Sequence, residues 1–238
     1  MRLASPLRWP PRPDERALMK QVTLSVDSLS KVFNRRTIFE EVSFTLQEQE
    51  SLAVTGRNGS GKSTLAKILC GLLSSNAGYV RCSVEGKEIP SENMFQHVGF
   101  VAPYLNMYEE FSGKENLRII SNIRNLAGDT AAEAQKLLKE FGIFERRNDD
   151  VRTYSSGMKQ RLKYAAALLH HPEILILDEP TANLDQEGID VVRKRMKAQT
   201  AEGILLIATN EREDLEYVRV FIDLDGRKTS QVTSQVYP

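Results

Sequence analysis

The sequence has few cysteines and no long apolar run. Cys70 and Cys82 are its two cysteines, and neither stands at metal-ligand spacing from another cysteine or a histidine pair. This usage argues against a disulfide framework and a cysteine metal site, and it favours a reducing compartment. No window approaches eighteen consecutive apolar residues. We therefore expect any membrane role to depend on a partner protein.

The sequence also lacks an excess of charge of either sign. Thirty-two Lys and Arg balance thirty-two Asp and Glu in a chain of 238 residues, so no overall field attracts nucleic acid. We therefore expect no nucleic-acid partner. The 41% of hydrophobic residues is typical of a folded globular protein rather than a disordered one. The length suits one large α/β domain or two small ones.

Residues 1–18 differ from the rest of the chain. They contain four prolines and four arginines without an apolar period, which predicts a disordered tail. Asp14 and Glu15, together with the scarcity of serine, argue against a transit peptide. We therefore expect a tail at 1–18 and one folded domain at 19–238.

Apolar spacing predicts the order of strands and helices. Alternating apolar residues at 22–26 and 42–46 flank a turn at 34–36 and predict half-buried antiparallel strands. Continuous apolar runs predict central parallel strands covered on both faces, and helical periods predict helices. The predicted strands are 51–55, 174–177 and 204–208, and the predicted helices are 63–73 and 186–200.

The segment from about 109 to 169 has an almost wholly helical period, with predicted caps at Ser112 and Ser155. We therefore predict an inserted α-helical subdomain. The expected fold is α/β, with a mostly parallel central sheet, an N-terminal antiparallel β subdomain and this helical insertion.

A glycine-rich loop lies between the predicted strand 51–55 and the helix that follows it. It matches the phosphate-binding pattern G-x-x-x-x-G-K-[ST], in which glycines let backbone N–H groups face phosphate oxygens. The predicted nucleotide-binding residues here are Gly56, Arg57, Asn58, Gly59, Ser60, Gly61, Lys62, Ser63 and Thr64. Lys62 is expected to bridge the β- and γ-phosphates, Ser63 to bind Mg²⁺ and Thr64 to bind the α-phosphate. The flanking strand and helix disfavour the alternative of a simple glycine turn that caps a helix.

A second chemical pattern ends the predicted strand at 174–177. Asp178 and Glu179 follow the strand, and Pro180 stops its extension. Adjacent side chains on a strand point to opposite faces. Asp178 is therefore a predicted Mg²⁺ ligand, and Glu179 is a predicted general base or water-orienting group.

The segment 154–162 resembles the signature sequence of the ATP-binding-cassette (ABC) family, L-S-G-G-Q followed by Q-R. Ser155 and Gly157 match the pattern, whereas Tyr154, Ser156 and Met158 replace other positions. With the two motifs above, the chain resembles this P-loop NTPase family from Met19 to about Arg227. The resemblance implies that Ser155, Ser156 and Gly157 bind nucleotide held by the opposite subunit of a dimer. A simple helix cap is the alternative interpretation of this segment.

The resemblance implies roles for two further residues. Asp185 lies in the stretch that matches the family's loop after the catalytic glutamate, which implies a place at the dimer seam. Phe33 stands at the position of the aromatic residue that stacks on adenine. A lone phenylalanine near a strand is more often a core residue.

Two positions depart from the family pattern. The glutamine loop aligns with residues 98–103, where Pro103 replaces the glutamine that helps to hold Mg²⁺ and water. Asn210 stands where the family has its switch histidine. We interpret the three histidines, at 97, 170 and 171, as surface or loop residues that do not fill this role. A slow ATPase is therefore as consistent with the sequence as a fast one. Asn210 could instead cap a helix that begins near Glu211.

The resemblance implies an ATP-binding and ATP-hydrolysing subunit of an ABC transporter. ATP and Mg²⁺ are the implied cofactors, and the implied partners are a second cassette and a separate transmembrane permease at the cytoplasmic face of the plasma membrane. The short single cassette is similar to exporter types, such as the haem exporter ATPase of cytochrome c maturation. The alternative function is a soluble cassette ATPase of the iron–sulfur assembly type, acting without a permease. The aromatic stretch 104–111 could line a groove for a permease helix or belong to the subdomain core.

Overall fold

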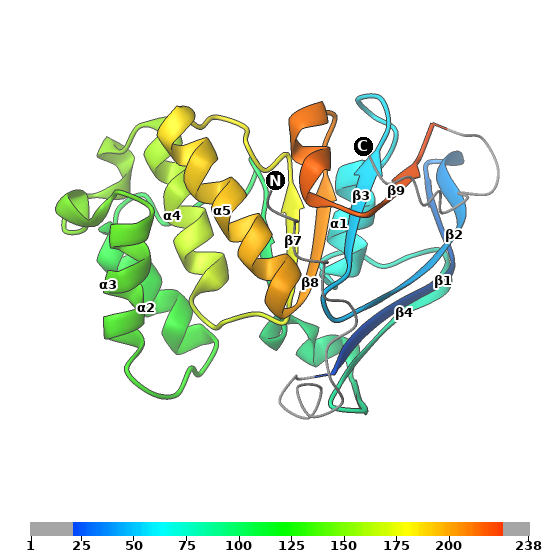
Figure 1. The fold of residues 1–238 in the computed structure, drawn as a ribbon, viewed down its shortest axis with the longest axis horizontal. Coiled ribbons are helices and arrows are strands. Elements are labelled where there is room, and N and C mark those ends of the chain that lie inside the picture. The colour runs from blue at the N-terminus through cyan, green and yellow to red at the C-terminus, as the bar shows by residue number, and fades with distance from the viewer. Residues whose placement is uncertain (1–20, 226–238) are drawn as a thin grey trace, which may run out of the picture.

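The computed structural model describes residues 21–225 as three layers. An antiparallel sheet covers one face of a parallel sheet, and most of the helices cover the other (Figure 1). The predicted tail at 1–18 lies outside the described residues, so the predicted domain limits of 19 and 238 stay a prediction. The order of layers is the α/β architecture expected from the sequence.

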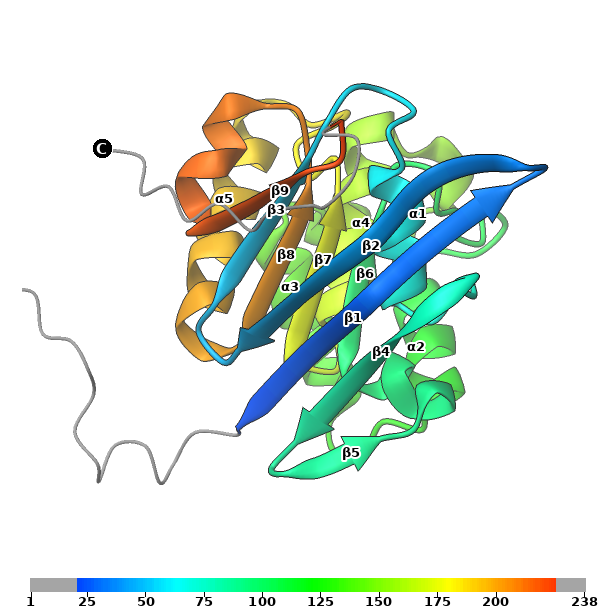
Figure 2. The ribbon, with the colours of Figure 1, turned by 90° about the vertical axis from the view of Figure 1, so that its right-hand side faces the viewer.

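The antiparallel sheet forms from alternating apolar residues and lies in front in Figure 2. Its strands, in the spatial order β2-β1-β4-β5, are β1 (Val22–Phe33), β2 (Arg36–Gln47), β4 (Ala77–Val84) and β5 (Lys87–Ile89). Val22, Leu24 and Val26 are buried, whereas the residues between them are partly exposed. This alternation confirms the predicted half-buried strands.

The parallel sheet is buried on both faces. Its strands, in the order β6-β7-β8-β3-β9, are β3 (Ser51–Thr55), β6 (Val98–Val101), β7 (Ile174–Asp178), β8 (Ile204–Ala208) and β9 (Val220–Asp223). Ile174 and Ile176 pack in the core toward the antiparallel sheet, and Leu175 and Leu177 pack in the core toward the helices. The continuous apolar strands therefore pack against two cores, one on each face of the sheet, which confirms the predicted central strands.

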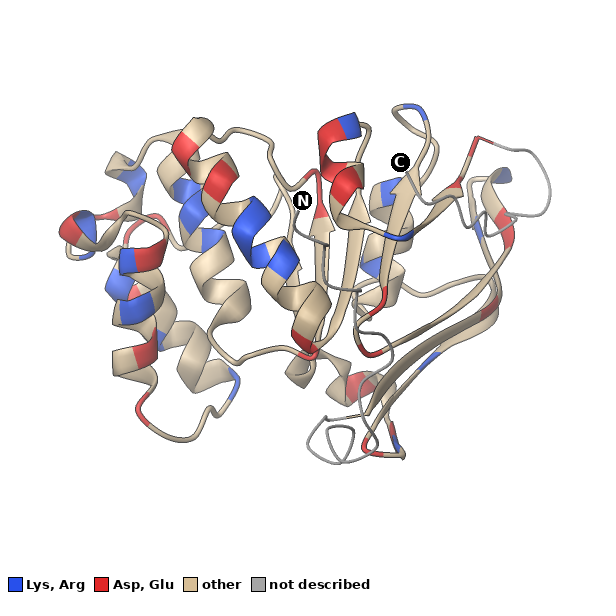
Figure 3. Cartoon of the chain, viewed as in Figure 1, with Lys and Arg blue, Asp and Glu red and all other residues tan. Residues whose placement is uncertain are grey.

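The helices flank this sheet. The α-helices are α1 (Lys62–Leu69), α2 (Gly113–Ile123), α3 (Thr130–Glu140), α4 (Ser156–Leu168) and α5 (Gln186–Glu202). The 3-10 helices are η2 (Ser91–Gln96), η3 (Phe144–Arg146), η4 (Val151–Thr153) and η5 (Arg212–Tyr217). Among the described residues, no helix is both long and apolar enough to cross a membrane. Figure 3 shows both signs of charge on the same helices.

The helical insertion lies between β6 and β7, as the sequence predicts. Ser112 begins α2 with a reciprocal capping box, in which its hydroxyl accepts from the N–H of Glu115 and the Glu115 carboxylate accepts from the N–H of Ser112. The prediction for α1 was too long, because α1 ends at Leu69 instead of residue 73. Gly71 has a φ of +73°, and this left-handed residue stops the helix.

The parallel order of the strands brings the predicted functional residues to one edge of the sheet. The carboxyl ends of β3, β7 and β8 point to the same side, which is upward in Figure 1. The loop 56–61 follows β3, the carboxylates Asp178 and Glu179 end and follow β7, and residues 209–211 follow β8. Ligands of open α/β sheets bind at this edge.

Candidate functional site

The phosphate-binding loop has the conformation that its glycines predict. Gly56 and Gly61 have φ values of +134° and +109°. A Cβ atom on Gly56 would come within 2.6 Å of the Ser60 Oγ atom, and one on Gly61 within 2.5 Å of the Ile38 Cγ2 atom. Both positions therefore require glycine. Gly61 is the N-cap of α1, so the loop leads directly to the positive end of a helix.

Lys62 is held inside this loop. Its ammonium donates a hydrogen bond of 2.7 Å to the carbonyl of Gly56, and only 5% of the residue is exposed. Carbonyl oxygens do not neutralise an ammonium, so its charge is available to an anion at the loop. Ser63 and Thr64 follow in the first turn of α1 and are partly buried. The predicted phosphate contacts of Lys62, Ser63 and Thr64 stay predictions.

Asp178 is the most unusual charged group at this edge. It is 1% exposed, and neither carboxylate oxygen has a hydrogen-bond partner among the described residues. A buried carboxylate without a partner costs several kcal/mol, on the order of 3–5, unless a cation balances it. An Asp carboxylate and the Ser63 hydroxyl are hard oxygen ligands of the kind that Mg²⁺ prefers. The residues present therefore fit the predicted ion.

Few protein ligands would hold such an ion. Residues 21–225 contain no group of three His, Cys, Asp or Glu side chains able to hold a metal. Magnesium often binds through one or two protein groups while phosphate oxygens and water complete its shell. The small donor set at Asp178 and Ser63 is therefore suited to a metal bound together with a nucleotide.

Glu179 has a strained backbone and a perturbed carboxyl group. Its φ is +50°, and its N–H donates to the carbonyl of Ala208 at 2.8 Å. Such a conformation costs a non-glycine residue about 1–3 kcal/mol and is concentrated at functional sites. Burial raises the pKa of Glu179, the neighbouring Lys62 lowers it, and the charge of Asp178 raises it again. A net raised pKa suits a carboxylate that takes a proton from water.

Asn210 contacts the phosphate-binding loop directly. Its side-chain N–H donates to the Oδ1 atom of Asn58 at 3.0 Å. The alternative that Asn210 caps a helix is wrong, because Glu211 is the N-cap of η5. The Thr209 hydroxyl accepts from the N–H of Glu211 at 3.0 Å and satisfies the start of the turn. Asn210 is therefore not the cap of this helix, and its role as a switch residue stays a prediction.

Two further residues at the carboxyl edge of the parallel sheet were not predicted from the sequence. Asp225 accepts from the N–H of Arg57 at 2.6 Å, which joins the loop to the end of β9. Asp214 is fully buried and accepts from the hydroxyls of Thr209 and Thr181 at 3.1 and 3.3 Å. Neither aspartate belongs to a local motif, because each is brought to the site by a strand or turn distant in sequence.

The signature segment forms a second helix start. Ser155 is the N-cap of α4 and accepts from the N–H of Met158 at 3.2 Å. Ser155 and Ser156 are exposed, and a Cβ atom on Gly157 would lie 3.2 Å from the carbonyl of Asn183. The start of α4 lies across the sheet from the loop before α1, on the left in Figure 1. The starts of α1 and α4 are therefore separate within one chain.

Asp185 and Phe33 contact residues outside the phosphate-binding loop. Asp185 is the N-cap of α5 and forms an ion pair with Arg161, a buried residue of α4. The hydrogen bond from Arg161 is the main reason that the pKa of Asp185 is lowered. Phe33 is 43% exposed, and the ammonium of Lys31 lies 4.7 Å from its ring centroid. Their nucleotide contacts stay predictions.

The three histidines, interpreted as surface or loop residues, all lie outside the helices and strands, and two of them are partly buried. His170 is mostly buried beside Arg124, with 3.1 Å between the His170 Nε2 atom and Arg124 Nη1. Burial, followed by the charge of Arg124, lowers the pKa of His170 to about 4. His97 is partly buried and pairs with Glu173 at 3.2 Å. Both precede strands, so they lie at the amino-terminal edge of the sheet, opposite the phosphate-binding loop.

Comparisons with known proteins agree with this geometry. The family model for ABC transporters matches residues 39–182. An ABC transporter ATP-binding protein of Bacillus subtilis is 33% identical over 91% of this chain and 71% of that protein. A lantibiotic transport ATP-binding protein of Streptococcus pyogenes is 31% identical over 84% of this chain and 85% of that protein.

A solved structure supports the same relation. The ATP-binding subunit of an ABC transporter superposes with a TM-score of 0.76 at 30% identity, over 88% of this chain and 89% of that one. The chain spans 62% to 71% of the length of several curated relatives. Similarity therefore extends over both the antiparallel and the parallel sheet.

Proposed function

This chain belongs to the ABC transporter family as an ATP-binding subunit, and we propose that it hydrolyses MgATP to drive a separate transmembrane permease. The observation that carries this proposal is the buried, unpartnered carboxylate of Asp178 beside a glycine loop that holds Lys62. A phosphate–magnesium pair supplies both the anion for the loop and the cation for the carboxylate.

Each group of the carboxyl edge has a task in this proposal. The loop N–H groups and the start of α1 bind the phosphates, and Lys62 adds a charge-assisted bond. Ser63 and Asp178 would hold Mg²⁺, which would neutralise charge on the phosphate oxygens. Glu179 accepts the proton of the attacking water, and its raised pKa makes it a stronger base than an ordinary carboxylate.

We further propose that two chains pair head to tail. Figure 1 shows α4 on the other side of the sheet from α1, so each chain would present two half-sites, one at the start of each helix. A head-to-tail pair would place the start of α4 of one chain at the nucleotide of the other. Asp185 lies at the start of α5 and pairs with Arg161 of α4. It would therefore lie at the dimer seam together with the start of α4.

The aromatic stretch supports an attached permease. Tyr108 and Phe111 are 50% and 44% exposed, and their rings contact each other at a centroid distance of 6.2 Å. This exposure excludes the alternative that these two rings belong to the subdomain core. We propose that they receive a cytoplasmic helix of the permease, which would hold the subunit at the inner face of the membrane.

The relatives favour this role over the soluble-switch alternative, because one of them is named for lantibiotic transport. These names indicate neither the cargo of this chain nor the suggested likeness to the haem exporter. We propose neither a direction of transport nor a particular cargo, since the cargo contacts belong to the permease.

Calorimetric titration with ATP tests the nucleotide part of the proposal. The wild-type chain should bind ATP more tightly with Mg²⁺ than with EDTA, and Asp178→Asn should remove this difference while it retains binding in EDTA. Glu202→Gln, a change of an exposed carboxylate in α5, is the matched control. Equal Mg²⁺ dependence in wild type and Asp178→Asn would contradict the proposed metal ligand.

A further inference from the structure

Asp214 is a buried charge that has no task in the proposed reaction. It lies in η5 and is fully buried. Its Oδ1 atom has no hydrogen-bond partner among the described residues, and the Arg193 guanidinium lies 3.9 Å from this atom, beyond hydrogen-bond distance. Apolar residues in place of a buried ion pair often leave stability unchanged or raise it. Stability alone therefore does not account for a carboxylate at this position.

The other oxygen of Asp214 joins two turns. Its Oδ2 atom accepts from the Thr181 hydroxyl at 3.3 Å and from the Thr209 hydroxyl at 3.1 Å. Thr181 follows β7, and Thr209 follows β8. An ionised carboxylate only accepts hydrogen bonds, so both hydroxyls donate to it. One side chain therefore fixes the turns after two neighbouring strands relative to each other.

The turn after β7 carries Glu179 and is held at several points. The N–H of Ala182 donates to the carbonyl of Glu179 at 3.1 Å, which closes the turn. The Tyr164 hydroxyl, from α4, donates to the carbonyl of Pro180 at 2.6 Å. Thr181, two residues after Glu179, adds the contact with the buried carboxylate. These contacts surround a left-handed backbone that costs free energy and therefore needs support from its neighbours.

The turn after β8 carries Asn210 and starts at a buried residue. Thr209 is fully buried, and its hydroxyl donates to Asp214 and accepts from the N–H of Glu211. The residue between them, Asn210, contacts the phosphate-binding loop through Asn58. Asp214 is therefore hydrogen-bonded to one turn that carries the proposed base and to another that contacts the phosphate-binding loop.

We propose that Asp214 is a positioning residue of ATP hydrolysis, which holds Glu179 in the orientation that the attacking water requires. It acts through Thr181 rather than on the nucleotide. This inference rests on the proposed function, because it assumes that Glu179 is the base. Misplacement of a reacting group by about 1 Å can lower a rate by about a hundredfold. Loss of one hydroxyl contact, with the backbone contacts of the turn retained, should have a smaller effect.

ATP hydrolysis by variants of Thr181 in the full chain tests this role. Valine has nearly the shape of threonine and lacks the hydroxyl, whereas serine retains the hydroxyl. Thr181→Val should lower kcat about tenfold, while KM and the affinity for ATP change by no more than about twofold. Thr181→Ser should keep kcat within about twofold of the wild-type value. Thr200→Val, which removes a hydroxyl that donates to the carbonyl of Lys197 in α5, is the matched control and should show wild-type kcat.

A double variant connects the effect to Asp214. Asp214→Ala removes the acceptor of the Thr181 hydroxyl and should lower kcat at least as much as Thr181→Val. Addition of Thr181→Val to Asp214→Ala should cause no further fall in kcat, because both changes remove the same contact. The Thr181 variants decide the question by themselves if Asp214→Ala does not fold.

The outcomes separate this inference from the proposed function. Wild-type kcat in Thr181→Val would overturn the positioning role. An equal loss of kcat in Thr181→Val and Thr181→Ser would assign the effect to packing instead of the hydroxyl and would also overturn it, as would a further fall of kcat in the double variant. Wild-type kcat in Glu179→Gln would instead contradict the base assigned in the proposed function.

Discussion

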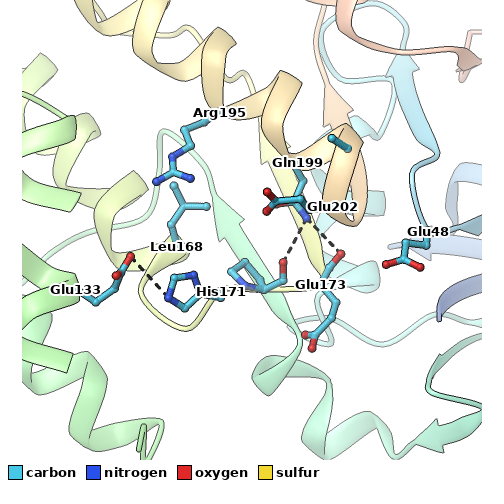
Figure 4. A pocket seen from close by; sticks show the side chains of 10 residues that line it. Glu48, Glu133, Leu168, His171, Glu173, Arg195, Gln199 and Glu202 are labelled. Carbon is cyan, nitrogen blue, oxygen red and sulfur yellow. Dashed lines mark hydrogen bonds and ion pairs between the residues drawn. The ribbon is translucent and has the colours of Figure 1, made fainter. Parts of the chain in front are cut away.

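The two ends of the parallel sheet differ in how their charges are balanced. The amino-terminal end contains a cavity of about 360 Å³, shown in Figure 4. Several of its polar groups have partners close by: His171 lies 3.6 Å from Glu133, and Arg195 pairs with Glu140. The Gln199 amide donates to the carbonyls of Pro172 and Glu173, each at 3.2 Å. The protein itself therefore supplies partners for Glu133, Arg195 and Gln199 at this end.

The carboxyl end has the opposite character. Its surface between the phosphate-binding loop and β9 is shallow, yet Asp178 is buried there without a partner and Glu179 has a left-handed backbone. A folded chain keeps such costs only where they serve a ligand or a reaction. The comparison teaches that a buried carboxylate without a protein partner, at Asp178, marks the functional end of this sheet.

The largest expected difference between the ends concerns ATP binding. Lys62→Ala should weaken ATP binding by about a hundredfold or more, because two charge-assisted bonds to phosphate are worth about 3 kcal/mol together. Lys197→Ala, on the exposed face of α5, should leave the affinity unchanged. Calorimetric titration of both variants checks this, and wild-type affinity in Lys62→Ala would contradict the assignment of the loop.

Hydrolysis should distinguish carboxylates at the two ends. Glu179→Gln should lower kcat by about a hundredfold, since it removes the proposed base while the Gln side chain keeps the shape of the site. With ATP and Mg²⁺ the variant should accumulate as a dimer in sedimentation experiments. Glu48→Gln, at the cavity end, should show wild-type kcat. A Glu179→Gln chain that stays monomeric at saturating ATP would contradict the head-to-tail pair.

A gain of activity should follow from Asn210→His. An imidazolium forms charge-assisted bonds to phosphate about twice as strong as those of an amide, and the benefit grows in the transition state. We expect kcat to rise about tenfold, with KM changed by only a few-fold. Asn210→Ser and Asn210→Ala provide the comparison. Equal or lower turnover in Asn210→His, at unchanged ATP affinity and melting temperature, would count against a switch role.

The sequence predicted the parts of this edge that depend on local spacing. The loop 56–64 and the pair Asp178 and Glu179 were found because strand, turn and helix signals are adjacent to them. The strand 204–208 was predicted with its observed limits because continuous apolar residues need two covered faces. The contact between Asp214 and Thr181 was not predicted, because the two residues are 33 positions apart in the sequence and belong to separate turns.

Two features that the sequence did not predict have the same physical origin. His170 contacts Arg124, the C-cap residue of α2, and the sequence near His170 gives no sign of this partner. Asn210 is a good helix cap by residue type, but the neighbouring Thr209 already donates to Asp214 and accepts from Glu211. Tertiary partners, rather than local preference, decided both positions.

The smallest expected effect is one that both ends should share. Burial raises the pKa of Glu179 and also that of Glu48. A carboxyl group whose pKa is higher in the folded than in the unfolded state lowers stability once the pH exceeds its unfolded pKa, and this cost is complete above the folded pKa. Glu179→Gln and Glu48→Gln should therefore each raise the melting temperature slightly at pH 8 and leave it unchanged at pH 3. Only Glu179→Gln should also change hydrolysis. Scanning calorimetry at the two pH values checks the prediction, and a melting temperature that falls at pH 8 in Glu179→Gln would show that the contact with Lys62 outweighs burial.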